Sequence, residues 1–173
     1  PGQPVRRWKH GDPEPIDLLN YILSGGIIVM HNAMFDRVVW NRVLRKLFPH
    51  WPEIKIPQTD CTMARACVLA LPPDLDTLGQ VLRLDVRKDK EGAALMRKMA
   101  KPRKITISQL KKAEKEGRTI SEWHDEPENI ERLGSYCDDD VRSEVGADKK
   151  LPALSASAGS ARSNVARTRW RAP

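Results

Sequence analysis

The first third of the chain switches between helical and strand-like patterns of apolar residues. Apolar positions from 16 to 23 follow Asp12-Pro13 at helical spacing, which predicts a helix with proline near its first turn and Gly25-Gly26 at its end. Residues 27–30, Ile-Ile-Val-Met, form a short apolar run next to glycine, typical of a strand buried on both faces of a sheet. Helical spacing then returns at 33–48, where Pro49 stops it. The order helix, strand, helix is that of an α/β domain.

A helical hairpin is predicted next. Asp60 is expected to cap a helix over residues 61–71, and Pro72-Pro73 breaks the pattern. Asp76 is expected to cap a second short helix that runs to Leu84.

The remaining pattern is helical up to a change of composition near residue 150. Residues 85–118 are rich in Lys and Arg, with short helices expected at 91–99 and 105–115. Pro127 opens a longer helix to about Val145, on which apolar residues recur every three or four positions. From Leu151 the chain turns to small and basic residues without helical or strand period, which is typical of disorder. We therefore expect a leading segment 1–12, a folded region 13–146 and a basic, disordered tail 147–173.

The net charge of +7 suggests nucleic-acid binding, but the charge is unevenly distributed along the chain. The tail 147–173 holds six Lys or Arg residues against one Asp, a net +5, which leaves only +2 for residues 1–146. A basic arm that binds phosphates and an accidental extension are both open interpretations of the tail. The chain has no run of eighteen or more apolar residues, so we expect no membrane partner.

Cysteine and tryptophan usage adds expectations about burial. Three cysteines without paired spacing favour a reducing cytoplasm over a disulfide framework. Cys67 is expected in the core, with Cys61 the more exposed of the two. The tryptophans at 40, 51 and 123 are expected to pack in the core or within a subdomain rather than to stack on bases.

The first group of candidate functional residues lies where the predicted strand meets the next helix. Asn32 could simply cap that helix, Phe35 could be core, and Asp36 could sit in the first turn, where the helix dipole favours a carboxylate. A carboxylate held rigidly at the edge of a sheet could instead bind a divalent cation.

The second group is Tyr136-Cys-Asp-Asp-Asp140 on the long C-terminal helix. Tyr136 and Asp140 are four residues apart and share a helix face, so a phenol and a carboxylate could converge on one site. The usual explanation of three successive aspartates is a solvated face, because their charges repel one another. A bound cation would remove that repulsion.

Together these two groups resemble the second and third motifs of DnaQ-like 3′-to-5′ exonucleases with tyrosine in motif three, members of the ribonuclease H-like superfamily. The resemblance covers about residues 13–146 and is to the exonuclease region of phage family A DNA polymerases. The stretches that carry it are 25–36, 60–66, 75–79, 88–92, 95–96, 101–103 and 136–144.

The resemblance implies a fold, a reaction and roles for particular residues. The fold would be a ribonuclease H-like α/β exonuclease domain, and two Mg²⁺ or Mn²⁺ ions would serve the hydrolysis of a single-stranded DNA 3′ end. Asp36 and Asp140 would be metal ligands and Tyr136 would orient the attacking water. Asn32 and Phe35 would shape the site around the terminal nucleotide, and His31 would border it. The partners would be DNA and the polymerase domain of a parent chain.

One departure from the family pattern limits this expectation. Motif one, an Asp-x-Glu on the first strand, is not found upstream of Asn32, because Asp12-Pro-Glu14 has polar flanks and a proline that suit a turn. We therefore expect a domain incomplete at its N-terminus, with its first strands missing, and an inactive fragment. Two alternatives stay open, a non-catalytic nucleic-acid-binding or interaction module and an RNA-directed exonuclease.

Overall fold

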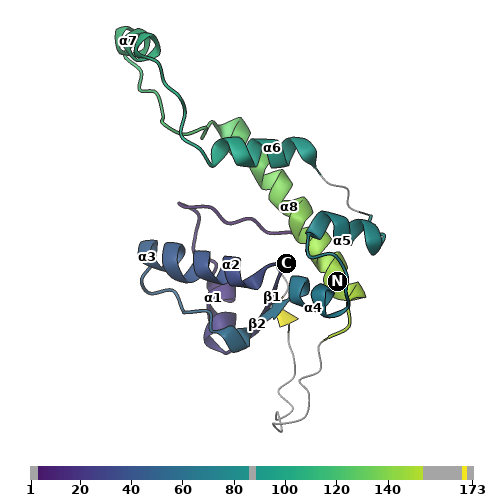
Figure 1. The fold of residues 1–173 in the computed structure, drawn as a ribbon. Helices are drawn as coiled ribbons and strands as arrows, with labels where there is room; N and C mark the ends of the chain where they lie inside the picture. The colour runs from purple at the N-terminus through teal and green to yellow at the C-terminus, as the bar shows by residue number, and fades with distance from the viewer. Residues whose placement is uncertain (1–3, 86–88, 154–168, 171–173) are drawn as a thin grey trace. The chain divides into compact units, whose positions relative to one another are not determined.

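The computed structural model describes residues 4–85, 89–153 and 169–170, which form two compact units. The sheet unit comprises Pro1–Arg87 and Asp140–Pro173, and the helical unit comprises Lys88–Asp139. Helix α8 (Pro127–Lys150) contributes its first half to the helical unit and its second half to the sheet unit. The protein is a mixed α/β structure in which helices predominate (Figure 1).

A small parallel sheet lies at the centre of the sheet unit, with strand order β2-β1-β3. Strand β1 (Ile27–Met30) aligns Ile28 with Thr59 of β2 (Thr59–Cys61) and Ile27 with Arg169 of β3 (Arg169–Trp170). The predicted strand at 27–30 is confirmed. Full burial on both faces is not, because only Met30 of its residues is buried.

The elements before and after β1 follow the predicted pattern. Helix α1 (Ile16–Leu23) ends at the glycine pair, where Gly25 adopts φ +83°. A Cβ atom on Gly26 would lie 2.3 Å from the ring of Tyr21, so the chain can pass this ring only as glycine. Asp12 and Glu14 lie before α1 and outside any strand, as their proline predicts.

The crossover from β1 to β2 begins with one helical rod. It consists of α2 (Ala33–Val39), the π-helical segment η1 (Trp40–Leu44) and α3 (Arg45–Leu47), and it ends before Pro49 as predicted. The rod packs through an aromatic cluster in which Trp51, 2% exposed, stacks on Phe48 at 4.6 Å between centroids and lies 5.0 Å from Trp40. The predicted packing role of Trp40 and Trp51 is confirmed.

Two predicted helix caps were wrong by one or two residues. After the 3-10 turn η2 (Ile56–Gln58), Asp60 belongs to β2, and helix α4 (Thr62–Val68) is capped by the Cys61 thiol, which accepts a hydrogen bond from the Ala64 N–H. Helix α5 (Leu75–Val81) is capped by Asp74, whose carboxylate accepts from the Thr77 N–H at 2.9 Å. The polar strand Thr59–Cys61 has no apolar run, so the pattern gave no reason to place a strand there.

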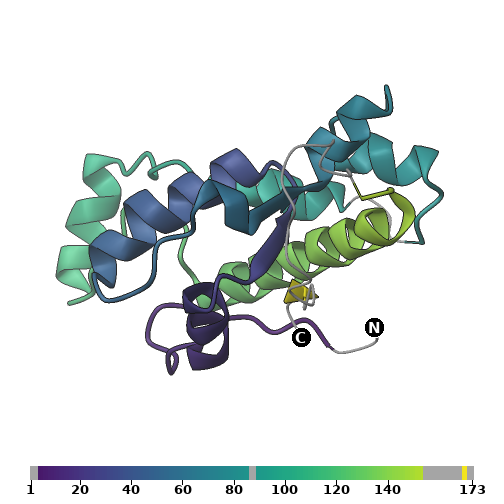
Figure 2. The same ribbon diagram turned by 90° about the horizontal axis from the view of Figure 1, so that it is seen from below.

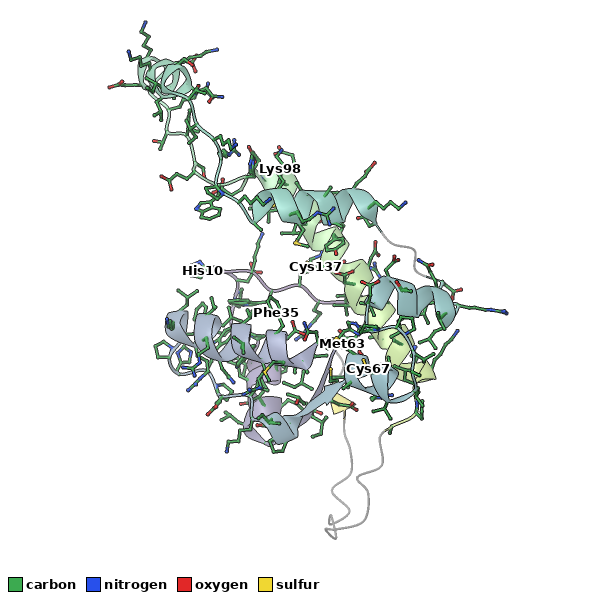
Figure 3. All side chains as sticks on the ribbon, in the orientation of Figure 1. His10, Phe35, Met63, Cys67, Lys98 and Cys137 are labelled. Carbon is green, nitrogen blue, oxygen red and sulfur yellow. The ribbon has the colours of Figure 1, made fainter. Side chains whose placement is uncertain are left out.

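The expected burial of the cysteines is also corrected. Cys67 is exposed on α4 (Figure 3), because Ala66 and not Cys67 faces the core. Cys61 is partly buried, since its thiol is held at the helix cap.

The last turns of α8 belong to the folded core, contrary to the expected tail boundary at residue 147. Ala147 and Leu151 are buried against Ala66 and Leu78 in one apolar cluster. Their apolar side chains therefore extend the folded region to at least Leu151. Residues 154–168 and 171–173 of the expected tail lie outside the described residues, while Arg169 and Trp170 form β3.

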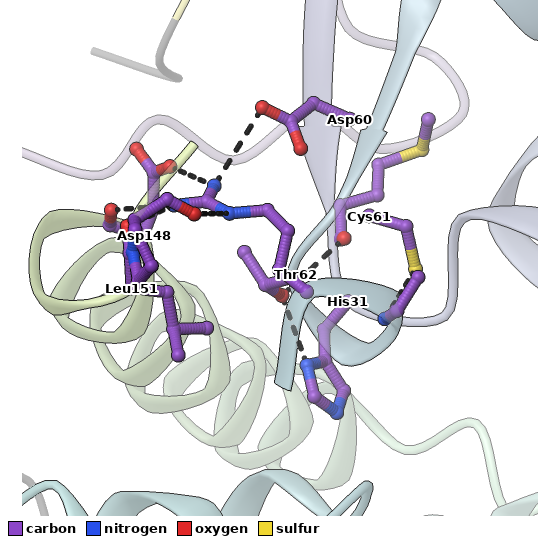
Figure 4. Close-up of polar contacts among 10 residues, drawn as sticks. His31, Asp60, Cys61, Thr62, Asp148 and Leu151 are labelled. Atoms are coloured by element: carbon purple, nitrogen blue, oxygen red, sulfur yellow. Dashed lines mark hydrogen bonds and ion pairs between the residues drawn. The ribbon is translucent and has the colours of Figure 1, made fainter. Parts of the chain in front are cut away.

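A buried arginine joins α4 to the end of α8. The guanidinium of Arg65, 1% exposed, donates to Asp148 Oδ1 at 2.6 Å and to the carbonyl oxygens of Asp148, Leu151 and Pro152 (Figure 4). Asp60 of β2 lies 3.6 Å from the same guanidinium. Because the last carbonyls of a helix lack partners within it, this one side chain both caps α8 and neutralises a buried carboxylate.

The helical unit contains α6 (Lys90–Met99), α7 (Ile107–Lys115) and the first half of α8, and α6 lies beside α8 (Figure 2). Arg132 of α8 pairs with both oxygens of Asp89 at 2.5 and 2.7 Å, and Asp89 in turn caps α6 at the Gly92 N–H. The guanidinium lowers the pKa of Asp89 to about 2. Trp123 is 49% exposed, so its expected place inside the fold was wrong. No helix within the described ranges has both the length and the apolar character needed to span a membrane.

Replacing Arg65 by Met should test the network that closes the sheet unit. We expect the free energy of unfolding to fall by about 3–5 kcal/mol, because Asp148 would keep a buried charge without its partner. Urea denaturation followed by circular dichroism measures this, with Arg42→Met as the control at an exposed position. A loss no larger than that of the control would contradict the structural role of Arg65.

Candidate active site

The turn between β1 and α2 places Asn32 in an unusual backbone conformation. Asn32 has φ 62° and ψ 52°, in the left-handed region that asparagine tolerates better than most residues. Its carbonyl oxygen accepts from the Phe35 N–H at 2.9 Å, but its side chain makes no capping hydrogen bond. The expected side-chain cap is therefore wrong. The Asn32 side chain is exposed, so its amide group is accessible to solvent.

Phe35 and Asp36 occupy the first turn of α2 with different exposure. Phe35 is 62% exposed (Figure 3), which rules out its interpretation as a core residue. Asp36 is partly buried, and burial raises the pKa of its carboxyl, while His31 acts in the opposite direction. A large apolar ring and a carboxyl thus lie side by side in sequence at the carboxyl end of β1.

His31 is held by both of its ring nitrogens. Nε2 lies 2.8 Å from the carbonyl oxygen of Pro73, and Nδ1 lies 2.9 Å from the Thr62 hydroxyl (Figure 4). Since a carbonyl only accepts, the proton of a neutral ring belongs on Nε2. His31 therefore ties the end of β1 to the start of α4.

The second half of α8 directs a line of carboxyl groups toward the same region. Asp140, Glu144 and Asp148 are spaced by four residues, so they share one helix face. Burial, followed by the charges of Asp36, Asp148 and Asp140, raises the pKa of Glu144 to about 8. Asp36 and Glu144 are more than a hundred positions apart in the chain, but both belong to the sheet unit and the charge of Asp36 acts on Glu144 there.

The carboxyl groups of this face have separate roles. Asp148 is neutralised by Arg65, so it belongs to the structural network. Glu144 has a buried Oε1 without a hydrogen-bond partner among the described residues. A buried polar atom of this kind carries the cost of desolvation unless an added group compensates it. Asp36, Asp140 and Glu144 therefore form the part of the cluster that could act on a ligand.

Sequence reasoning did not single out Glu144 as a site residue. Its signal was the spacing, since it continues the four-residue step from Tyr136 through Asp140 by one further turn. The run of three aspartates does not form one solvated face either, because Asp138 is buried while Asp140 is exposed.

Tyr136 belongs to the helical unit, where α6 packs closely against it. A Cβ atom on Gly92 would lie 2.7 Å from Tyr136 Cδ2 and 2.8 Å from its Cβ. Only glycine at position 92 allows this approach, so the lower part of the tyrosine side chain is held against α6. Its place one turn before Asp140 on α8 is the predicted one.

The donor chemistry of the cluster suits a hard divalent cation, but its assembly is incomplete. Asp36, Asp140 and Glu144 offer the carboxylate oxygens that Mg²⁺ and Mn²⁺ prefer, and the partnerless Oε1 is an oxygen that a cation could satisfy. Within residues 4–85, 89–153 and 169–170, no three Asp, Glu, His or Cys side chains are arranged as ligands of one metal ion. Further carboxylates would have to complete such a site.

Comparison with known proteins relates the chain to a polymerase. It is 34% identical over 136 residues to a DNA polymerase of Bacillus phage SP02, and the match takes in 78% of this chain. The chain is thus similar to a region of a phage DNA polymerase and spans about a fifth of that protein, 19% of its length. No family model matches the chain, and no solved structure matches it significantly.

The carboxyl cluster should make stability depend on pH. Folding raises the pKa of Glu144 from 4.5 to about 8, so the folded state holds this proton more tightly than the unfolded state does. The free energy of unfolding should therefore fall as the pH rises through this window, and the raised pKa of Asp36 acts in the same direction. Glu144→Gln should flatten the slope and raise the thermal midpoint at about pH 8. Glu53→Gln, at an exposed site, is the control. Equal slopes of the free energy of unfolding against pH in the wild type and in both variants would contradict a raised pKa of Glu144.

Proposed function

We propose that residues 13–146 are part of a 3′-to-5′ exonuclease domain of the ribonuclease H-like type, attached to a DNA polymerase. The observation that supports this proposal is that Asp36 and Asp140 both act electrostatically on Glu144, whose buried Oε1 has no hydrogen-bond partner among the described residues, in a chain similar to a phage DNA polymerase. The two motifs resemble exonuclease motifs two and three, and folding brings their carboxyl groups into one unit. Proofreading of single-stranded DNA 3′ ends is the activity that best fits this combination.

The proposed mechanism assigns a role to each side chain. Two Mg²⁺ or Mn²⁺ ions, when bound, would activate a water and stabilise the leaving 3′ oxygen. Asp36 and Asp140 would hold these ions, and Glu144 would add negative charge beside them. Tyr136 would orient the attacking water. Asn32 and Phe35 are exposed and would contact the terminal nucleotide, while His31 would hold the end of β1 in place.

The sheet offers a place for the carboxylates that the described residues lack. Strand β3 pairs with Ile27 and Ile28 of β1, on the edge away from β2. Among the described residues no strand pairs with Val29 and Met30 on that edge. We propose that an Asp-x-Glu strand placed there, parallel to β1, would complete the site at its carboxyl end, next to Asp36.

A second candidate function is a non-catalytic nucleic-acid-binding module. It is favoured by the finding that the described residues do not assemble three ligands for one metal ion. The two candidates differ in what an added Asp-x-Glu strand would do. It would create hydrolysis in the first case and none in the second. A third possibility, action on RNA, is separated from the first by comparing DNA and RNA 3′ ends as substrates.

The chain by itself should show no exonuclease activity above background with either Mg²⁺ or Mn²⁺. Asp36, Asp140 and Glu144 do not form a complete ligand set for two ions. Release of nucleotides from a 3′-labelled, single-stranded oligonucleotide measures this. Sustained digestion that Asp36→Ala abolishes would show that the site is complete without an added strand.

In a polymerase that carries this segment behind an Asp-x-Glu strand, Asp140→Ala should abolish metal-dependent hydrolysis. Tyr136→Phe removes one hydroxyl and no charge, so it should lower kcat by roughly ten- to a thousandfold while KM changes little. Polymerase activity should survive both changes and serves as the control for folding. Wild-type proofreading by the Asp140→Ala protein would overturn the proposed active site.

A further inference from the structure

Charge in the helical unit is divided between two consecutive segments. Residues 90–118 hold ten Lys or Arg residues against three Glu, a formal charge of +7. Residues 119–139 hold one Arg against seven Asp or Glu, a formal charge of −6. Because these two charges nearly cancel, the net charge of the unit is close to zero and does not reveal the basic segment 90–118.

Part of the basic segment is neutralised and part is not. Arg103 pairs with Glu126, and Lys112 and Arg118 pair with Glu116. Four exposed cations around the end of α6 have no acidic partner among the described residues, namely Arg97, Lys98, Lys101 and Lys104. Lys98, at the end of α6, is labelled in Figure 3. The Lys101 N–H donates to the Lys98 carbonyl oxygen, which holds this turn together.

Arg103 anchors the backbone of the segment that carries the exposed Trp123. Its backbone N–H donates to the Glu122 carbonyl oxygen at 2.7 Å, and its Nε donates to the Trp123 carbonyl oxygen at 2.6 Å. The loop after α6 and the segment before α8 therefore lie side by side. Trp123 is anchored through its backbone while its side chain is about half exposed.

We infer that Trp123 and the four cations Arg97, Lys98, Lys101 and Lys104, together called the basic-aromatic surface, bind single-stranded nucleic acid. An exposed aromatic ring can stack on a base, and neighbouring Lys and Arg side chains can follow the phosphates of the same strand. This inference rests on the proposed function, for which it supplies a contact to the substrate strand outside the carboxylate cluster.

The composition of the surface favours a nucleic acid over a protein partner. Lys is depleted in protein interfaces, whereas exposed Lys without acidic partners is common where phosphates bind. The side chain of Trp123 is itself exposed, and the hydrogen bonds of Arg103 hold its segment against the loop that carries Lys101 and Lys104. A protein partner would have to present a matching acidic surface, which makes that class the alternative outcome of the test.

The test measures binding of fluorescent oligo-dT and of a hairpin duplex to the full chain in EDTA, so that no hydrolysis occurs. Trp123→Ala should weaken oligo-dT binding roughly five- to a hundredfold, the equivalent of one stacked base, and should leave duplex binding nearly unchanged. Trp123→Phe should keep most of the affinity because it keeps a ring. Lys101→Gln with Lys104→Gln should reduce the slope of log affinity against log salt by about 1.4 for single strands.

The matched control neutralises two exposed cations of the sheet unit, Arg42→Gln with Lys46→Gln. Equal losses in the control and in the Lys101/Lys104 variant would overturn the inference, because binding would then follow net charge alone. Unchanged oligo-dT binding by Trp123→Ala, with weaker binding to a polymerase domain, would assign the surface to a protein partner and also overturn it. Because the measurement needs no metal, loss of the proposed exonuclease site would leave its result standing.

Discussion

The sheet unit depends on the buried guanidinium of Arg65. It is the point where α4, β2 and the end of α8 meet, since it contacts Asp148, Asp60 and the last carbonyl groups of the helix. A lysine could not satisfy this set, because only the planar fork of arginine presents several donors in fixed directions. Glu144 and Asp140 precede Asp148 by four and eight residues on the same face of α8, so the contact that holds Asp148 also restrains the direction of these two carboxyl groups.

The carboxyl groups of the candidate site need strong interactions around them, because like charges close together destabilise the folded state. Bringing the exposed Asp140 together with the partly buried Asp36 and Glu144 is unfavourable, because burial and then the neighbouring negative charges raise the pKa of Glu144 to about 8. Apolar packing of Ala147 and Leu151 and the ion pair of Asp148 supply the compensating stability on the same helix. Carboxyl groups that repel one another and have strongly shifted pKa values are typical of functional sites, where the surrounding packing compensates their cost.

The two units carry different parts of the proposed chemistry. The sheet unit holds the carboxyl groups, and the helical unit holds Tyr136 and the basic-aromatic surface. Similarity to a phage DNA polymerase covers most of the chain, so it includes sequence from both units.

The sequence by itself determined the local elements and the identity of the motif residues. Periodicity located β1, the rod from Ala33 to Leu47 and the start of α8, because apolar spacing follows directly from helix and strand geometry. It missed β2, whose residues are polar, and it placed the end of the folded region too early, because Ala147 and Leu151 show their role only against Ala66 and Leu78. The tertiary structure alone decided that Phe35 and Trp123 are exposed and that Glu144 joins Asp36. Such facts depend on contacts between residues far apart in the chain, which no local pattern records.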